Sequence, residues 1–170
     1  MAGYPSRALT SDQVAAIARV PNEIHCSFSS DTEIPLTTTL QKITVWTESD
    51  LSASVGVSES DGTFTVSTSA GVSLVVVRDY RNGDTNPADE VDATISFVIN
   101  NEEYETNTAI IPPATNPGGD GTLTKTTPFL LPVASGDQFE IYVSAEDNDA
   151  DPEDASLTGI KFTVIPAYAT

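Results

Sequence analysis

Residues 128–166 read PFLLPVASGDQFEIYVSAEDNDADPEDASLTGIKFTVIP and contain two segments in which apolar and polar residues alternate. The alternating apolar residues are Phe139, Ile141 and Val143 in the first segment and Ile160, Phe162 and Val164 in the second. Successive side chains of a β-strand point to opposite faces, so each segment predicts a strand with one apolar face. Ser135-Gly136-Asp137 predicts a turn before the first strand. Two such strands indicate a fold of packed β-sheets.

The rest of the chain repeats this pattern in short segments rich in Val, Ile, Thr, Phe and Tyr, as strands prefer. These segments are residues 24–28, 43–46, 51–57, 64–66, 72–77 and 95–99, with a weaker strand from Tyr104. Residues 72–77 are apolar on both faces, which predicts a central strand. Loops are predicted at 79–90, 112–121 and 146–154. The sequence therefore predicts an all-β jelly-roll sandwich of about ten antiparallel strands.

The first residues differ from this body and predict a short helical arm. Thr10-Ser11-Asp12-Gln13 has the pattern of a capping box, and apolar residues follow at helical spacing until Pro21. We therefore divide the chain into an arm, residues 1–22, and a jelly-roll domain, residues 23–170. The arm either packs on its own domain, docks on another protein or is disordered. The candidate docking residues are Tyr4, Arg7, Val14, Ile17 and Arg19.

The charge of the chain excludes several classes of partner. Seven Lys and Arg residues stand against 25 Asp and Glu, and the formal net charge is −18. Such a chain repels nucleic acid and anionic membranes. It contains no apolar run long enough to span a bilayer, which needs about 18 residues or more. With one cysteine, Cys26, it forms no disulfide within the chain. We expect neither nucleic acid nor a membrane as a partner.

Residues that could carry catalysis are few. His25 is the single histidine, and it adjoins Cys26. Neighbouring residues on a strand face opposite ways, so these two cannot form a Cys-His dyad. Cys26 is interpreted as a buried structural thiol. Phosphate-binding glycine loops and zinc-ligand spacings do not occur in the sequence. We expect no enzyme activity, no cofactor and no catalytic residue.

One acidic constellation leaves two interpretations open. Asp147, Asp149 and Asp151 alternate, and alternate carboxylates can converge on Ca²⁺. However, Pro152 stands where a calcium loop needs glycine, and Thr158 where it needs a bidentate glutamate. We expect a solvated acidic loop and no metal, with calcium as the alternative.

The order of these segments resembles the globular-head family of complement and tumour necrosis factor, in the divergent form found in phage and bacterial proteins. The matching stretches span residues 24–167 and read IHCSF, IPLTTTLQKITVW, GTFTVSTSAGVSLVVV, ATISFVINNEE, PFLLPVASGDQFEIYV and LTGIKFTVIPA. The chain departs from the family at Leu74, where an aromatic residue is frequent, and in the acidic insert. The resemblance implies a ten-strand jelly roll that forms a compact trimer without catalysis. By analogy, Leu130 or Tyr142 faces the trimer axis.

Two functions follow as hypotheses. The first is a trimeric virion structural protein, assembled in the host cytoplasm, that decorates the surface of a phage capsid. Its near-neutral arm would dock on the major capsid protein or another shell protein, and its acidic body would face outward. The second is a receptor- or glycan-binding tip of a phage head or tail fibre, in which the three predicted loops bind and Trp46 and Tyr80 stack on sugars.

Overall fold

A computed structural model describes residues 26–48, 56–67, 72–83, 90–114, 120–146 and 155–166, and these ranges contain strands, turns and loops without a helix. The predicted helical arm lies outside the described residues. The strands are β1 Cys26–Ser30, β2 Ile34–Pro35, β3 Gln41–Lys42, β4 Thr47–Glu48, β5 Val57–Ser60, β6 Thr63–Val66, β7 Val72–Asn82, β8 Val91–Ile99, β9 Glu102–Ile111, β10 Gly121–Leu131, β11 Gln138–Glu146 and β12 Ala155–Pro166.

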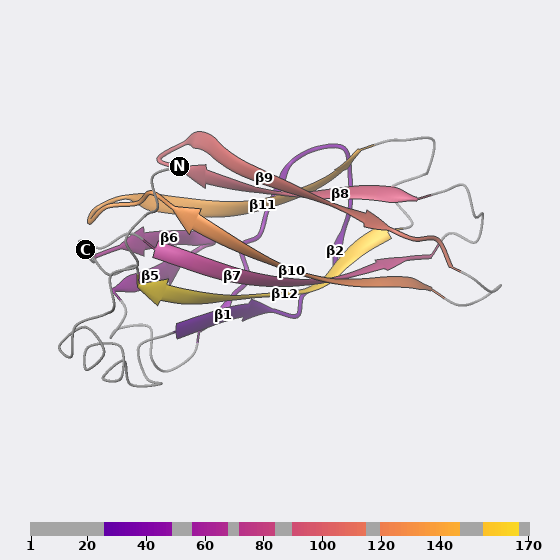
Figure 1. Cartoon of the computed structure of the whole chain (residues 1–170), viewed down its shortest axis with the longest axis horizontal. Coiled ribbons are helices and arrows are strands. Elements are labelled where there is room, and N and C mark those ends of the chain that lie inside the picture. The colour runs from indigo at the N-terminus through magenta and orange to yellow at the C-terminus, as the bar shows by residue number, and fades with distance from the viewer. Residues whose placement is uncertain are drawn as a thin grey trace, which may run out of the picture.

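The strands form two sheets that pack face to face (Figure 1). Sheet A has the order β10-β7-β12-β1-β4, and β2 also pairs with β12. Sheet B has the order β5-β6-β11-β8-β9, and β3 also pairs with β11. Every pairing among the described strands is antiparallel. The last strand, β12, lies between β7 and β1, so sheet A joins distant parts of the chain. The predicted antiparallel sandwich with a jelly-roll arrangement is confirmed.

The two strands singled out from the sequence form the centre of the core. Phe139 and Ile141 on β11 and Phe162 on β12 are fully buried. Phe162 stacks on Phe28 of β1 with ring centroids 5.0 Å apart and meets Phe64 of β6 edge-on at 4.9 Å. These rings join the two sheets, because Phe28 and Phe162 belong to sheet A and Phe64 to sheet B. Aromatic pairs in such geometries add about 0.5–1.5 kcal/mol beyond their area burial.

Three predictions about individual segments need correction. The predicted loop at 79–90 begins later, because β7 continues through Tyr80 to Asn82. The strand predicted at residues 43–46 is not found, because this segment has no strand pairing; Ile43 is buried and Val45 is 57% exposed. Strand β10 was not predicted, because it is rich in threonine and contains Pro128. Proline is tolerated there because β10 is the edge strand of sheet A.

The predicted turn at Ser135-Gly136-Asp137 is confirmed, and two further turns also contain residues with positive φ. Asp61 and Gly62 have φ angles of 51° and 75°. Asn100 and Asn101 have φ angles of 50° and 70°. Two-residue hairpin turns require such positive φ angles. Gly136 has φ 99°, and the preceding Ala134 N–H donates to the Asp137 carboxylate at 2.7 Å. Each turn therefore sits at a residue type that tolerates the left-handed region.

Replacing Gly62 with alanine is expected to destabilise the fold more than the same change at Gly136. Both glycines have positive φ, which costs an alanine about 1–2 kcal/mol. A Cβ at Gly62 would also lie 2.3 Å from the Ile43 carbonyl oxygen, whereas a Cβ at Gly136 meets nothing within 4 Å. Relieving that clash adds about 1–3 kcal/mol. Urea denaturation of both variants measures the difference, and equal losses would contradict the described contact between Gly62 and Ile43.

Candidate functional site

The outward side of sheet A is the first candidate surface. Alternation along the paired strands places its side chains away from the core. We call this set the sheet A face; it consists of Ser27, Ser29, Val75, Val77, Asp79, Arg81, Thr122, Thr124, Thr126, Pro128, Leu130, Lys161 and Thr163. Across it, Pro128, Val75 and Thr163 form one register row, and Leu130 is 62% exposed. The surface is a sheet of threonine, serine and aliphatic side chains.

The sheet A face is nearly free of acidic groups. Strands β1, β7, β10 and β12 carry one acid among them, Asp79, in a chain of net charge −18. Asp79 accepts a hydrogen bond from the Thr124 hydroxyl at 2.6 Å. Lys161 supplies positive charge on the same face, whereas Arg81 is paired with Glu33 at 2.7 Å and with Asp120 at 3.8 Å, two acids that flank the face outside these four strands. Charge repulsion between two copies is therefore weakest where these faces approach each other.

The outward side of sheet B carries a charged network instead. The Lys42 ammonium donates to Glu140 Oε1 at 2.6 Å and to the Thr63 hydroxyl at 2.8 Å. The Thr63 hydroxyl also donates to Glu140 Oε1 at 2.9 Å, and the Tyr142 hydroxyl donates to Glu140 Oε2 at 2.8 Å. Both carboxylate oxygens of Glu140 are thus engaged within the fold. Strands β3, β6 and β11 position the network side by side.

This network shifts two pKa values. Partial burial acts to raise the pKa of Glu140, but hydrogen bonds from Lys42, Tyr142 and Thr63 outweigh it and lower that pKa. The hydrogen bond to the ionised Glu140 raises the pKa of Tyr142, because losing the hydroxyl proton would break that bond. The network therefore favours the charged form of Glu140 and the neutral form of Tyr142, and it holds no free base for catalysis.

Replacing Glu140 with glutamine is expected to remove stability at neutral pH and to change nothing in acid. A carboxylate whose folded pKa is lowered contributes stability above its unfolded pKa, about 4.5, and loses it as the pH falls through the folded value. Denaturation midpoints from pH 7 to pH 3 should show the two proteins converging below pH 4.5. Glu146→Gln, an exposed change on the same strand, is the control. A constant gap across the range would contradict this account.

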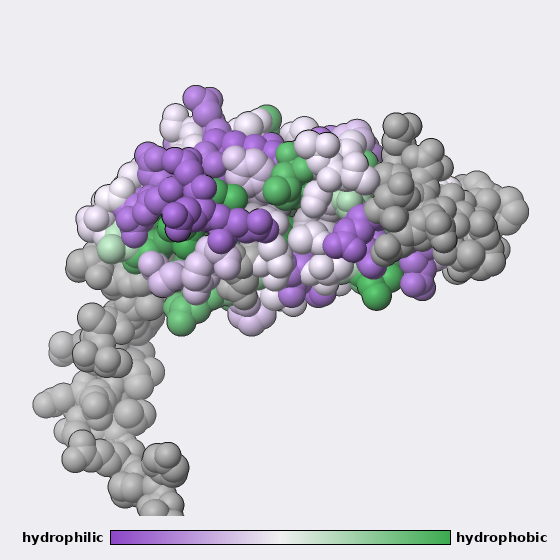
Figure 2. Space-filling model, turned by 90° about the horizontal axis from the view of Figure 1, so that it is seen from above, coloured by the Kyte–Doolittle hydropathy of each residue, from purple (hydrophilic) through white to green (hydrophobic). Residues whose placement is uncertain are grey.

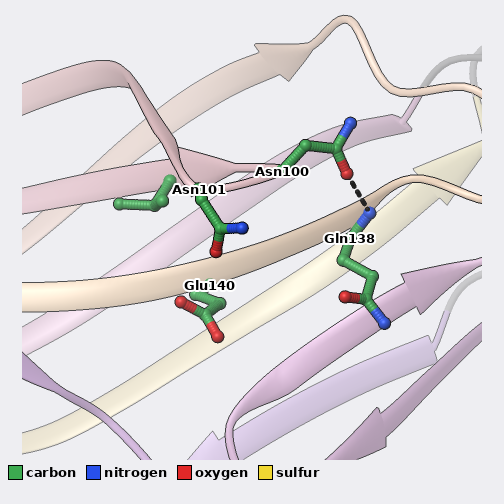
Figure 3. Close-up of a pocket in the computed structure, with 5 residues that line it drawn as sticks. Asn100, Asn101, Gln138 and Glu140 are labelled. Atoms are coloured by element: carbon green, nitrogen blue, oxygen red, sulfur yellow. Dashed lines mark hydrogen bonds between the residues drawn. The ribbon is translucent and has the colours of Figure 1, made fainter.

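A shallow pocket lies beside the network at the turn between β8 and β9 (Figure 3). Its volume is about 150 Å³, and its lining residues are Val98, Asn100, Asn101, Gln138 and Glu140. Asn100 Oδ1 accepts from the Gln138 N–H at 3.0 Å, and Asn100 Nδ2 donates to Asp137 at 2.8 Å. Figure 2 shows hydrophilic side chains gathered at the end where this turn lies. The pocket is smaller than typical ligand sites of about 300–1,000 Å³ and contains no nucleophile.

The two residues predicted for the trimer axis lie on opposite faces of the sandwich. Leu130 belongs to the sheet A face, and Tyr142 belongs to the outward side of sheet B. One flat contact with a single neighbour can include Leu130 or Tyr142 but not both. The Tyr142 hydroxyl already donates a hydrogen bond to Glu140 within the same chain, whereas the Leu130 side chain is exposed.

The aromatic residues proposed for sugar stacking belong to the core. Tyr80 is 2% exposed, so the prediction that it stacks on a ligand at the surface is wrong. Trp46 packs edge-on against Phe64 and Phe162 at 5.3 and 5.2 Å, and its Nε1–H donates to the Ile43 carbonyl at 2.9 Å. Both rings face inward because they close the apolar space between the sheets.

Other predicted residues lie outside the described part of the chain. These are the arm residues Tyr4, Arg7, Val14, Ile17 and Arg19, together with His25, Asp147, Asp149 and Asp151. Within the described ranges, no three His, Cys, Asp or Glu side chains come together as a metal site would need. No helix in those ranges has the length and apolar content to cross a membrane.

Sequence reasoning missed one buried charge, Arg78. It is 0% exposed and lies on β7 on the same side as Leu74 and Val76. Its guanidinium donates to Asn107 on β9 and to Thr127 on β10. The alternation Leu74, Val76, Arg78, Tyr80 was visible in the sequence and would have placed Arg78 in the core.

Strand order, pairing and core define the class of this protein as a jelly-roll β-sandwich. No protein-family model and no curated protein sequence matches the chain. Similar solved structures include murine APRIL, at 12% identity over 83% of this chain and 99% of that one with a TM-score of 0.44. Eiger TNF from S. frugiperda matches at 14% identity over 86% and 95%, with a TM-score of 0.48. Pika GITRL matches at 10% identity over 85% and 98%, with a TM-score of 0.34.

The resemblance to tumour necrosis factor-like jelly rolls, expected from the sequence motifs, is thus found among solved structures. The fold assignment rests on the strand order and register described above. The phage form of the family stays a prediction.

Proposed function

We propose that this chain is a non-enzymatic protein that assembles as a homotrimer through the sheet A face. One observation carries the proposal: in a strongly acidic chain, the four strands of this face carry a single acid, Asp79, and Leu130 is exposed there. The centres of protein interfaces are depleted of charged residues. In a cyclic trimer each copy offers two different patches to its neighbours, so the sheet A face need not pair with itself. The assembly of three copies is what the resemblance of the sequence motifs to the complement and tumour necrosis factor family implies.

We further propose that the trimer decorates the outer surface of a phage capsid and docks through residues 1–22. The acidic body would repel packaged DNA and so favour an outward position. The arm carries Arg7 and Arg19 against Asp12, and its apolar residues suit a protein surface. The engagement of both Glu140 oxygens within the fold supports a structural role over a catalytic one.

Deleting residues 1–21 is expected to abolish binding to the capsid shell while leaving a folded trimer. The arm supplies the docking contacts in this proposal, and the sandwich supplies assembly. Co-sedimentation of the purified protein with undecorated shells of the same virus measures binding, and native mass spectrometry measures assembly. Val14→Ser with Ile17→Ser, compared with Arg7→Gln with Arg19→Gln, separates apolar from charged docking. Undiminished shell binding by the deletion variant would refute the role of the arm.

A further inference from the structure

A second pocket lies at the turn between β8 and β9, and it shares Asn100 with the pocket drawn in Figure 3. Its volume is about 230 Å³, and its lining residues are Ile99, Asn100, Glu102, Glu103, Tyr104 and Pro132. Pro132 directly follows β10, so the pocket joins the turn of sheet B to the end of a sheet A strand. Sites for whole small molecules measure about 300–1,000 Å³. The pocket is therefore of a size for one side chain of a partner protein.

A β-bulge places Tyr104 at this pocket. In the pairing of β8 with β9, Phe97 lies opposite Glu105. The next residue, Val98, lies opposite Glu103, so Tyr104 has no partner on β8. A bulge re-aims the side chain of the extra residue, and Tyr104 is 48% exposed on the edge strand of sheet B. Bulges and charges also protect a sheet edge from pairing with another chain, but an exposed aromatic ring does not add to that protection.

Two carboxylates stand beside this ring. Glu102 and Glu103 are exposed and line the pocket. The ion pairs found within the described part of the chain use Glu140, Glu33 and Asp120 instead. In a chain of net charge −18, such a place attracts cations and repels anions. The face of an aromatic ring also attracts a cation, so the ring and the carboxylates favour the same kind of group.

We propose that this pocket binds the side chain of an arginine on a partner protein. The guanidinium stacks on the Tyr104 ring and donates to the carboxylates of Glu102 and Glu103. Its planar fork suits both contacts, and it is less strongly hydrated than the ammonium of lysine. The aliphatic stem of the arginine lies against Pro132 and Ile99, as the stems of long cationic side chains do on apolar surface. The proposal depends neither on the trimer nor on the virion role.

Titration of the ¹⁵N-labelled full chain with N-acetyl-arginine amide tests the site. We expect the backbone amide resonances of residues 99–104 to shift and to saturate at constant ionic strength. N-acetyl-citrulline amide is the matched probe, because citrulline has nearly the shape of arginine without its charge. It should leave these resonances in place. An equal response to both probes would overturn the proposal, because the pocket would then not select a cation.

Three variants separate binding in the pocket from general attraction to an acidic chain. Tyr104→Leu should weaken binding of the arginine probe about two- to fivefold, as loss of an exposed cation–π contact does. Glu103→Gln should weaken it up to about fivefold. Glu48→Gln removes the same charge from an exposed position on β4 in sheet A and should leave the affinity unchanged.

All three replaced side chains are exposed, so the variants should keep the fold, and the amide resonances outside the pocket check this. Equal weakening by Glu103→Gln and Glu48→Gln would overturn the proposal, because attraction to the overall charge would then explain the binding. Unchanged affinity in Tyr104→Leu would overturn it as well, because the bulged ring would then take no part.

Discussion

Replacing Val75 and Leu130 together with aspartate is expected to convert the trimer into monomers. Both side chains lie on the sheet A face, and Leu130 is 62% exposed in the single chain. Inside an interface, each new carboxylate would be buried without a partner, which costs about 3–5 kcal/mol. The dissociation constant should therefore rise by at least about 100-fold for each substitution. Sedimentation equilibrium across micromolar concentrations measures the change.

Ile110→Asp is the matched control for this experiment. Ile110 is 57% exposed, close to the exposure of Leu130, but it lies on β9 in sheet B. The sandwich should remain folded in all variants because none of these side chains belongs to the core. A Val75→Asp, Leu130→Asp protein that stays trimeric would remove the sheet A face from the interface. Monomers from Ile110→Asp and trimers from the double variant would place the contact on sheet B.

Replacing Phe162 with alanine is expected to destabilise the sandwich by about 3–5 kcal/mol. Phe162 is fully buried at the centre of sheet A. Its ring contacts Phe28 at 5.0 Å, Phe64 at 4.9 Å and Trp46 at 5.2 Å, so the truncation leaves a cavity between both sheets. This loss is a large share of the stability of a domain of this size, which is about 5–15 kcal/mol.

Guanidinium denaturation followed by Trp46 fluorescence measures the effect, because Trp46 reports the packing of that cluster. Tyr104→Ala removes an aromatic ring that is 48% exposed and should change stability by less than about 0.5 kcal/mol. Equal protein concentrations keep the contribution of assembly the same in both measurements. Similar losses from the two variants would show that the cluster around Phe162 does not hold the sheets together.

The sequence predicted the fold where alternation and turn residues agree. Strand β11 alternates without interruption, and Phe139, Ile141 and Val143 face the core. Strand β12 alternates from Ile160 to Val164, after a register shift between Leu157 and Gly159. The central position of β7 followed from its apolar run, since β7 lies between β10 and β12. The end of β7 was missed because Arg78 and Asp79 resemble a loop in composition. Strand β10 was missed because Pro128 argues against a strand unless that strand is known to be at an edge.

The candidate surfaces could be predicted less well, because they depend on which strands become neighbours. Lys42 and Glu140 are 98 residues apart in sequence, and only the pairing of β3 with β11 brings them together. The same limit explains why Leu130 and Tyr142 were both predicted to face the trimer axis. Periodicity shows that each side chain faces away from the core, but it does not show that the two residues belong to different sheets. The scarcity of acidic residues on the sheet A face likewise emerges from four strands that are far apart in the chain.

The native mass of the purified full chain tests the central claim most directly. The account predicts a species of three times the 17.9 kDa chain mass at micromolar concentration, which dissociates when Val75 and Leu130 are replaced with aspartate. A single chain mass that persists to high protein concentration would contradict assembly through the sheet A face.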